Sequence, residues 1–243
     1  MEVHDTDLSD NPILEGLLSI KSLKSLFLSR CKGVSRNQFN LLSKSLILLK
    51  RLKFISNEFP LGLIISTIGK SLRELKTNQL DKEAGEFILK HCSETLTHLE
   101  VVGVNSSIQK IFYNLIKKSK LNYLKVCLCK ESGQILNDLG KHLPNSLKDL
   151  ALFGLYTYKG FAVEDLENLL SDCNVSLESL EVYGTINSDF LVIILNYIKR
   201  NRNFRSLSIK LYGKGWEEKE LLLLKDINKY GIKTIVNSTL NTL

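Results

Sequence analysis

The stretch SLKSLFLSRC, residues 22–31, carries a leucine spacing that recurs throughout the chain. Leu23, Leu26 and Leu28 are separated by three positions and then by two. Side chains alternate between the two faces of a β-strand, so the second and third of these leucines point to the same side. The first leucine lies where the chain turns into the strand. The stretch therefore predicts a short strand with one buried face.

The same Leu-x-x-Leu-x-Leu spacing, with conservative replacements, is found nine times. The copies begin at Leu23, Leu49, Leu72, Leu96, Leu121, Leu147, Leu177, Phe204 and Ile232. Successive copies are 23 to 30 residues apart. Repetition at this period indicates a solenoid, in which stacked units bury a continuous core that no unit could bury alone.

Between the strands, the apolar spacing becomes that of a helix. One helical stripe consists of Ile108, Ile111, Phe112, Leu115 and Ile116, and a second of Phe190, Ile193, Ile194, Tyr197 and Ile198. Positions i, i+3, i+4, i+7 and i+8 share one face of a helix. Helix N-caps are expected at Asp81, Ser106 and Ser188. Alternating strands and helices predict an α/β fold with a parallel sheet on one side and helices on the other.

The strand motif, the unit length and the cysteine at the ninth position of the first copy, Cys31, resemble the ribonuclease-inhibitor-like, cysteine-containing leucine-rich repeats. The segments LIISTIGKSLREL (63–75) and EFILKHCSETLTHLEV (86–101) resemble the repeats of fungal F-box/leucine-rich-repeat proteins. The resemblance covers residues 13–243. It implies a right-handed solenoid shaped like a horseshoe, with the parallel sheet on the concave face and the helices on the convex face.

Proteins of this family are substrate receptors of SCF-type ubiquitin ligases. In them an N-terminal F-box docks on the adaptor Skp1 and the repeats hold the substrate. The 22 residues before Leu23 are too few for an F-box, so adaptor docking is assigned to no residue and would need an F-box upstream. Residues 1–12 are expected to form an acidic, disordered or frayed N-terminus. Residues 13–243 are expected to form a single domain of eight to nine units.

The five cysteines are predicted to be reduced thiols, and Cys92, Cys129 and Cys173 to be buried and structural. The pairs His91-Cys92 and Cys127-x-Cys129 leave a metal ion without its remaining ligands, so no metal site is expected. The polar N-terminus is not a secretory signal, and no stretch reaches the roughly 18 apolar residues of a membrane span. The protein is therefore expected in the cytoplasm or nucleus.

No motif predicts an enzyme or a cofactor. The segment STIGKS, residues 66–71, ends like a phosphate-binding loop, but Ile64 stands where that loop requires glycine. The formal net charge of +7 raises nucleic acid as a ligand. The basic residues are spread along the chain, however, and those in Lys117–Lys120 and Lys199–Arg202 end helices, where cations are favoured. Nucleic-acid binding is therefore the second alternative function.

The third, fifth and seventh residues of each copy are expected to face solvent from the sheet. Because parallel strands lie about 4.8 Å apart, each of these positions forms a column across the strands. The column at position seven contains four neighbouring apolar or aromatic side chains: Val102, Cys127, Phe153 and Tyr183. Such a patch, rimmed by polar groups, indicates a protein-binding site.

The predicted partner-binding site also includes Tyr123, His98, Glu100 and Lys125. Two simpler explanations stay open. Glu100 lies between lysines in column five and can form exposed ion pairs worth under about 1 kcal/mol. A loop, or the long unit that begins at Leu147, can cover the apolar column. Phe153 and Tyr183 are the expected anchors of the bound partner.

The sequence thus favours a non-catalytic protein-interaction module, with the substrate-recognition repeats of an F-box-like receptor as the leading hypothesis. The first alternative is a free-standing leucine-rich-repeat scaffold or inhibitor without a ligase connection. The identity of the partner is not encoded in any recognisable motif.

Overall fold

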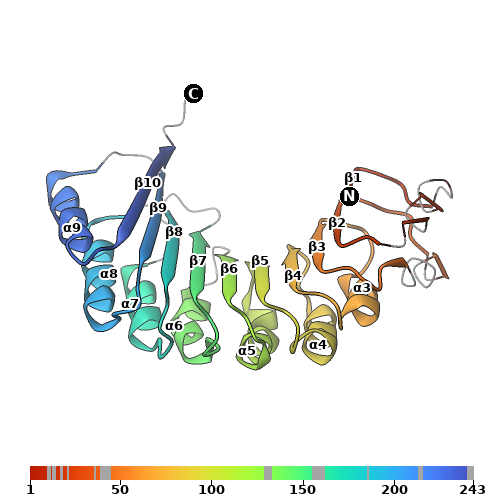
Figure 1. Cartoon of the computed structure of the whole chain (residues 1–243), viewed down its shortest axis with the longest axis horizontal. Coiled ribbons are helices and arrows are strands. Elements are labelled where there is room, and N and C mark those ends of the chain that lie inside the picture. Colours follow the sequence, from red (N-terminus) through yellow and green to blue (C-terminus); the bar gives the residue numbers. More distant parts are fainter. Residues whose placement is uncertain are drawn as a thin grey trace. The chain divides into compact units, whose positions relative to one another are not determined.

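Each Leu-x-x-Leu-x-Leu copy forms a β-strand in the computed structural model of the chain (Figure 1). With one additional strand at the N-terminus they make a single all-parallel sheet of ten strands, ordered β1 to β10 as in the sequence. The residues that the structure describes are 1–9, 12, 15–16, 19–20, 22–35, 37–38, 45–128, 133–154, 162–184, 186–212 and 216–239. The predicted α/β class and the parallel sheet are confirmed.

The strands are short and evenly spaced along the sequence. They are β1 (Glu2–His4), β2 (Ser25–Ser29), β3 (Arg51–Ile55), β4 (Glu74–Thr77), β5 (His98–Val104), β6 (Tyr123–Leu128), β7 (Asp149–Gly154), β8 (Ser179–Gly184), β9 (Ser206–Tyr212) and β10 (Lys233–Thr239). Strand pairing places equivalent positions of neighbouring copies in register, as in Leu150 with Leu180. The repeat therefore sets the pairing of the strands.

The helices follow the strands in turn and lie on one side of them in Figure 1. They are α3 (Leu61–Ile68), α4 (Lys82–His91), the 3-10 turn η1 (Ser106–Ile108), α5 (Gln109–Lys118), α6 (Gly133–His142), α7 (Val163–Ser171), α8 (Ser188–Arg200) and α9 (Glu218–Asn228). Within the described residues, no helix is long and apolar enough to cross a membrane.

The leucines of the repeat form the core. Leu99 and Leu124, at position four of their copies, are 0% exposed, and so are the position-six residues Val101 and Val126. These side chains point to the same side of the sheet because they are two residues apart. The prediction that positions four and six are buried is confirmed for these strands.

Two of the three predicted helix caps are shifted by one residue. Asp81 caps α4 as expected, because its carboxylate accepts a hydrogen bond from the Ala84 amide at 2.7 Å. Asn105, rather than Ser106, caps η1, and Asn187, rather than Ser188, caps α8. In each of these two cases the asparagine side chain accepts from the amide two residues further on.

The N-terminus contains a strand where the sequence suggested a disordered or frayed segment. Residues Glu2–His4 pair in parallel with β2, and Asp7 forms a further bridge to Lys32. Val3 and Leu8 are 7% and 1% exposed. This part of residues 1–12 therefore extends the sheet by one strand and adds two side chains to the core.

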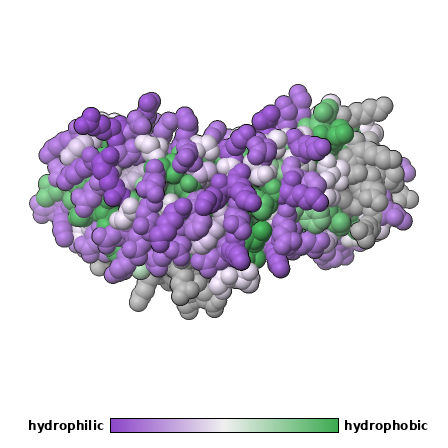
Figure 2. All heavy atoms as spheres, turned by 90° about the horizontal axis from the view of Figure 1, so that it is seen from below, coloured by the Kyte–Doolittle hydropathy of each residue, from purple (hydrophilic) through white to green (hydrophobic). Residues whose placement is uncertain are grey.

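The chain divides into two compact units. Unit 1 comprises Met1–Gly103 and Lys110–Leu121, and unit 2 comprises Val104–Gln109 and Asn122–Leu243. The predicted single repeat domain over residues 13–243 stays a prediction. The surface seen in Figure 2 is mainly hydrophilic, and its hydrophobic atoms gather only in separate patches.

Candidate protein-binding surface on the sheet

The predicted columns of outward side chains are present in unit 2. In the fifth-position column Lys125 lies beside Ala151, which lies beside Glu181. The seventh-position column runs Cys127, Phe153, Tyr183 and Lys210 across strands β6 to β9. Alternation of side chains along each strand therefore places these groups on the face opposite the leucines.

Phe153 and Tyr183 form a stacked aromatic pair on β7 and β8. Their ring centroids are 3.4 Å apart and the ring planes are inclined by 24°. The pair is possible because the two residues are directly in register on neighbouring parallel strands. Contacts between aromatic rings contribute about 0.5–1.5 kcal/mol beyond the area that they bury.

Two lysines lie over this aromatic pair. The Lys125 ammonium is 4.0 Å from the centre of the Phe153 ring, and the Lys210 ammonium is 4.3 Å from the centre of the Tyr183 ring. Both distances are within the range of cation–π attraction. Lys125 reaches its ring from the fifth-position column, and Lys210 reaches its ring from the neighbouring strand.

A carboxylate completes the arrangement. The Tyr183 hydroxyl donates to Glu181 Oε1 at 2.6 Å, while the Lys210 ammonium donates to the Tyr183 hydroxyl. Lys210 and Glu181 are also an ion pair at 3.5 Å. We refer to Lys125, Phe153, Glu181, Tyr183 and Lys210 as the aromatic–lysine cluster.

The contacts within the cluster shift the pKa values of two of its groups. Burial, followed by the hydrogen bond to Glu181, raises the pKa of Tyr183 above its ordinary value. The hydrogen bond to Tyr183 is the largest contribution that raises the pKa of Lys210. At neutral pH the phenol is therefore neutral and the ammonium is charged.

The expectation that the four apolar or aromatic side chains of the seventh-position column face solvent is wrong for two of them. Cys127 is 6% exposed and Tyr183 is 9% exposed, whereas Phe153 and Val102 are half-buried. Tyr183 is covered because the stacked Phe153 ring and Lys210 lie against it. Neighbouring side chains on the sheet thus bury much of the apolar column.

The eight predicted site residues fall into both units. Val102, His98 and Glu100 belong to unit 1, and Cys127, Phe153, Tyr183, Tyr123 and Lys125 belong to unit 2. The structure brings Phe153, Tyr183 and Lys125 into direct contact. Tyr123, at position three of β6, is half-buried.

In unit 1, the fifth-position ion pair that the sequence suggested is present. Glu100 lies 2.7 Å from the Lys76 ammonium, in register across β4 and β5. His98 is exposed. On the sheet of unit 1 a lysine also lies over an aromatic ring, since the Lys53 ammonium is 3.6 Å from the centre of the Phe27 ring. The His4 ring meets the same phenylalanine edge-on at 4.4 Å.

Glu181 and Lys210 are the members of the cluster that sequence reasoning left out of the site. The repeat itself contained the signal. Glu181 and Lys210 occupy positions five and seven of their copies, so both were in the outward columns next to Tyr183. A search for opposite charges beside an aromatic residue in adjacent copies would have found them.

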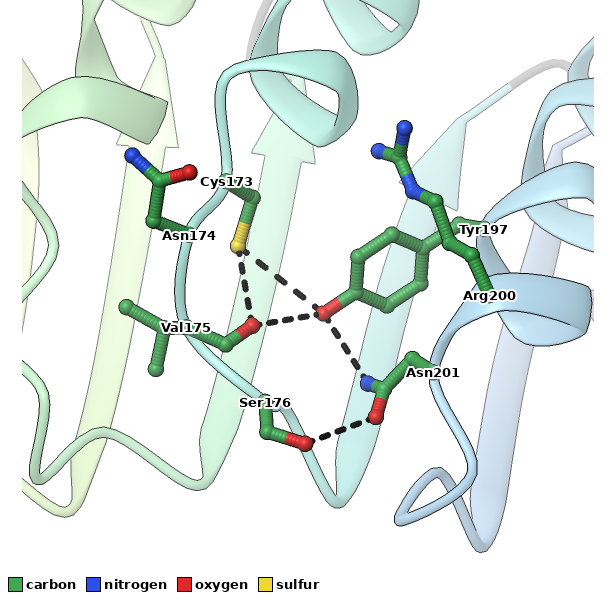
Figure 3. A pocket seen from close by; sticks show the side chains of 7 residues that line it. All are labelled: Cys173, Asn174, Val175, Ser176, Tyr197, Arg200 and Asn201. Atoms are coloured by element: carbon green, nitrogen blue, oxygen red, sulfur yellow. Dashed lines mark hydrogen bonds between the residues drawn. The ribbon is translucent and has the colours of Figure 1, made fainter.

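A pocket of about 240 Å³ lies between the segment that follows α7 and the end of α8 (Figure 3). Its lining consists of Cys173, Asn174, Val175, Ser176, Tyr197, Arg200 and Asn201. The Tyr197 hydroxyl donates to the Val175 carbonyl at 3.0 Å and accepts from Asn201 Nδ2 at 3.1 Å. The Asn201 side-chain oxygen accepts from the Ser176 hydroxyl at 2.7 Å.

The polar groups of this pocket join the end of α8 to the segment that precedes β8. Burial is the main cause that raises the pKa of the Cys173 thiol and of the Tyr197 phenol. Both groups therefore stay protonated at neutral pH and are poor nucleophiles. The Arg200 guanidinium donates to the Leu170 carbonyl and lies over the Tyr197 ring. These contacts connect the end of α8 to the preceding repeat, which contains α7.

The described cysteines form no disulfide with one another. Cys31, Cys92 and Cys127 are buried, and Cys173 is half-buried. Cys129, predicted to be structural, lies outside the described residues. Among the described side chains, no group of three or more His, Cys, Asp or Glu residues is arranged to hold a metal ion.

Comparison with known proteins assigns no family to the chain. No protein-family model matches it, and no curated protein matches it. Its function must therefore be argued from the residues themselves.

Proposed function

We propose that this chain is a non-catalytic protein-interaction module whose partner binds the open face of the sheet over β6 to β9. The observation that carries the proposal is the aromatic–lysine cluster. It presents a half-buried phenylalanine between charged groups on a continuous run of parallel strands.

The contacts within the cluster favour binding because they hold the side chains in place before the partner arrives. Phe153 is stacked on Tyr183, and Tyr183 is hydrogen-bonded to Glu181 and Lys210. Little side-chain freedom remains to be lost on association, which lowers the entropic cost of binding. Binding energy at protein interfaces is concentrated in aromatic and cationic groups of this kind.

The fold proposed for this module is a right-handed leucine-rich-repeat horseshoe, with the sheet on the concave face and the helices on the convex face. The repeat period, the parallel register and the helices on one side of the sheet support it. The resemblance to fungal F-box/leucine-rich-repeat proteins extends the proposal to substrate recognition in an SCF-type ubiquitin ligase. Contact with a Skp1-type adaptor would need an F-box upstream of these repeats.

The binding surface is tested by affinity capture from cell extract with the immobilised wild-type chain and two variants. Phe153→Ala removes the half-buried ring of the cluster. Leu221→Ala is the matched control, because Leu221 is a large apolar side chain, 46% exposed, on helix α9. A protein partner captured by the wild type is then purified and its Kd is measured for all three.

The proposal expects Phe153→Ala to weaken binding about 30-fold or more, which corresponds to about 2 kcal/mol, and Leu221→Ala to change it less than about twofold. Equal affinity of the wild type and Phe153→Ala would contradict the surface assignment. Recovery of a Skp1-type adaptor and a cullin with the full-length gene product supports the ligase role. A partner that binds without either favours a free-standing scaffold or inhibitor.

A further inference from the structure

The positive charge of the chain is concentrated in unit 1. This unit contains 18 Lys and Arg against 12 Asp and Glu, a formal net charge of +6, whereas unit 2 contains 15 against 14, a net charge of +1. The excess of positive charge therefore belongs to unit 1 and is not a general feature of the repeated sequence. A local excess of charge attracts partners of the opposite sign.

Part of this excess is arranged in a row at the edge where the strands of unit 1 begin. Lys24, Lys50 and Arg73 each occupy the second position of their copy, directly after the first leucine. The Lys50 amide donates to the Lys24 carbonyl at 2.9 Å, and the Arg73 amide donates to the Lys50 carbonyl at 2.8 Å. The three residues are thus on neighbouring chain segments, about 4.8 Å apart at each step.

The side chains of Lys24, Lys50 and Arg73 are exposed to solvent. None of the three side chains forms an ion pair with another described residue. Glu74, which follows Arg73, is also exposed and forms no described ion pair with the row. The row is therefore available to a partner from outside the chain.

In unit 2 the second position carries both signs of charge, because its residues are Asn122, Lys148, Glu178, Arg205 and Lys233. There Lys148 is followed in the next copy by Glu178, and the two form an ion pair at 2.8 Å. The Glu178 amide donates to the Lys148 carbonyl at 2.7 Å, the same backbone contact that joins the row in unit 1. In unit 2 an acidic residue thus interrupts the cations of the second position and pairs with Lys148, whereas the row in unit 1 is three successive cations that form no ion pair with a described residue.

We propose that the row formed by Lys24, Lys50 and Arg73 is a second docking site, which binds an acidic polypeptide segment with several closely spaced carboxylates. Three adjacent cations can each meet a carboxylate of such a segment. This site is separate from the aromatic–lysine cluster, which lies in unit 2.

The observations favour a polypeptide over a nucleic acid. Single-stranded nucleic acids are held by basic grooves in which exposed aromatic rings stack on the bases. On the described sheet face of unit 1, the ring of Phe27 is already covered by Lys53 and met edge-on by His4. The row also spans only three strands, too short for the many phosphate contacts that strong non-specific binding requires.

The test uses the full chain and a fluorescein-labelled peptide of ten glutamates, with fluorescence anisotropy as the readout. The row variant is Lys24→Gln, Lys50→Gln and Arg73→Gln together. The control variant is Lys82→Gln, Lys110→Gln and Lys219→Gln, which removes the same charge from exposed positions on helices. Circular dichroism checks that both variants keep the fold.

We expect the row variant to bind the glutamate peptide about tenfold more weakly than the wild type, and the control variant to lose less than about twofold. Salt should weaken the wild-type complex, because exposed charges are screened. Equal loss in both variants, or no binding by the wild type, overturns the proposal. A labelled ten-nucleotide single strand that binds the wild type more tightly than the peptide does, and is released by the row variant, also overturns it in favour of nucleic acid.

Discussion

The assignment of the two faces of the sheet is tested most directly on a single strand. Leu150 and Phe153 both lie in β7, at positions four and seven of their copy, and point to opposite sides. Leu150 is 1% exposed and lies in register between Leu124 and Leu180. Replacing it with alanine removes buried atoms and leaves a cavity, which costs about 2–5 kcal/mol of unfolding free energy.

Phe153→Ala should cost less. The substitution removes one aromatic contact, worth about 0.5–1.5 kcal/mol, and one contact with the Lys125 ammonium, worth about 0.5–1 kcal/mol at an exposed site. The expected loss is therefore about 1–2.5 kcal/mol. The structure predicts more than the negligible effect that a solvent-facing ring would have, because the ring is stacked on Tyr183.

The assay is urea denaturation followed by circular dichroism, with the unfolding free energy obtained by linear extrapolation. Adding Tyr183→Ala and the double variant closes a double-mutant cycle, in which the two rings should couple by about 0.5–1.5 kcal/mol. If Phe153→Ala destabilises the protein as much as Leu150→Ala does, the face assignment is wrong. If the two aromatic substitutions are simply additive, the stack does not contribute as described.

Three further predictions concern the interior. Burial raises the pKa of the Cys92 thiol to about 12, so iodoacetamide at pH 8 should label it slowly in the native protein and fast in urea, as followed by peptide mass spectrometry. Asn57→Ala removes the acceptor 2.9 Å from the buried Cys31 amide and should lower the unfolding free energy by about 1–3 kcal/mol in urea titrations. Gly140→Ala would place a β-carbon 2.3 Å from a carbonyl oxygen of the next helix and should cost about 1–3 kcal/mol, whereas Gly16→Ala, with no described atom within 4 Å, should change stability by under about 0.5 kcal/mol.

The repeat made most of the fold predictable from the sequence. Each leucine motif marks a strand, and the fixed spacing of positions four and six places those side chains in the core, except in the last copy, where Ile235 at position four is 39% exposed. Leu99 and Leu124 are fully buried for this reason. The prediction is strong because the motif is repeated. A copy with a substituted leucine can still be recognised from its spacing to the adjacent copies.

Features that occur once were harder to predict. The strand at Glu2–His4 carries no leucine motif, and only its pairing with β2 makes it a strand. At two helix starts an asparagine precedes a serine, and both residue types are good caps. In the structure Asn105 and Asn187 are the N-caps, and their side chains accept hydrogen bonds from the amides two residues further on. Local propensity alone does not separate these options.

The sequence predicted which side chains lie on the outer face of the sheet at the candidate site. It did not predict how far those side chains are exposed to solvent. Alternation along β7 and β8 placed Phe153 and Tyr183 on the outer face, and the register makes them neighbours. Whether a side chain on that face is covered depends on the length of the groups around it. Lys125 and Lys210 are long enough to lie over the rings, so Tyr183 is buried although it points away from the core.

The position of these lysines constrains the partner that the sheet can accept. Because Lys125 and Lys210 already lie over the aromatic rings, the cluster does not offer an empty cage for a cation from outside. A cationic partner would have to displace an ammonium that the rings already attract. A carboxylate can instead approach Lys125 and Lys210 from solvent while an apolar group covers the remaining surface of Phe153. The partner expected on the sheet is therefore a protein segment that carries an acidic residue beside an apolar one, a pairing that a uniformly acidic peptide lacks.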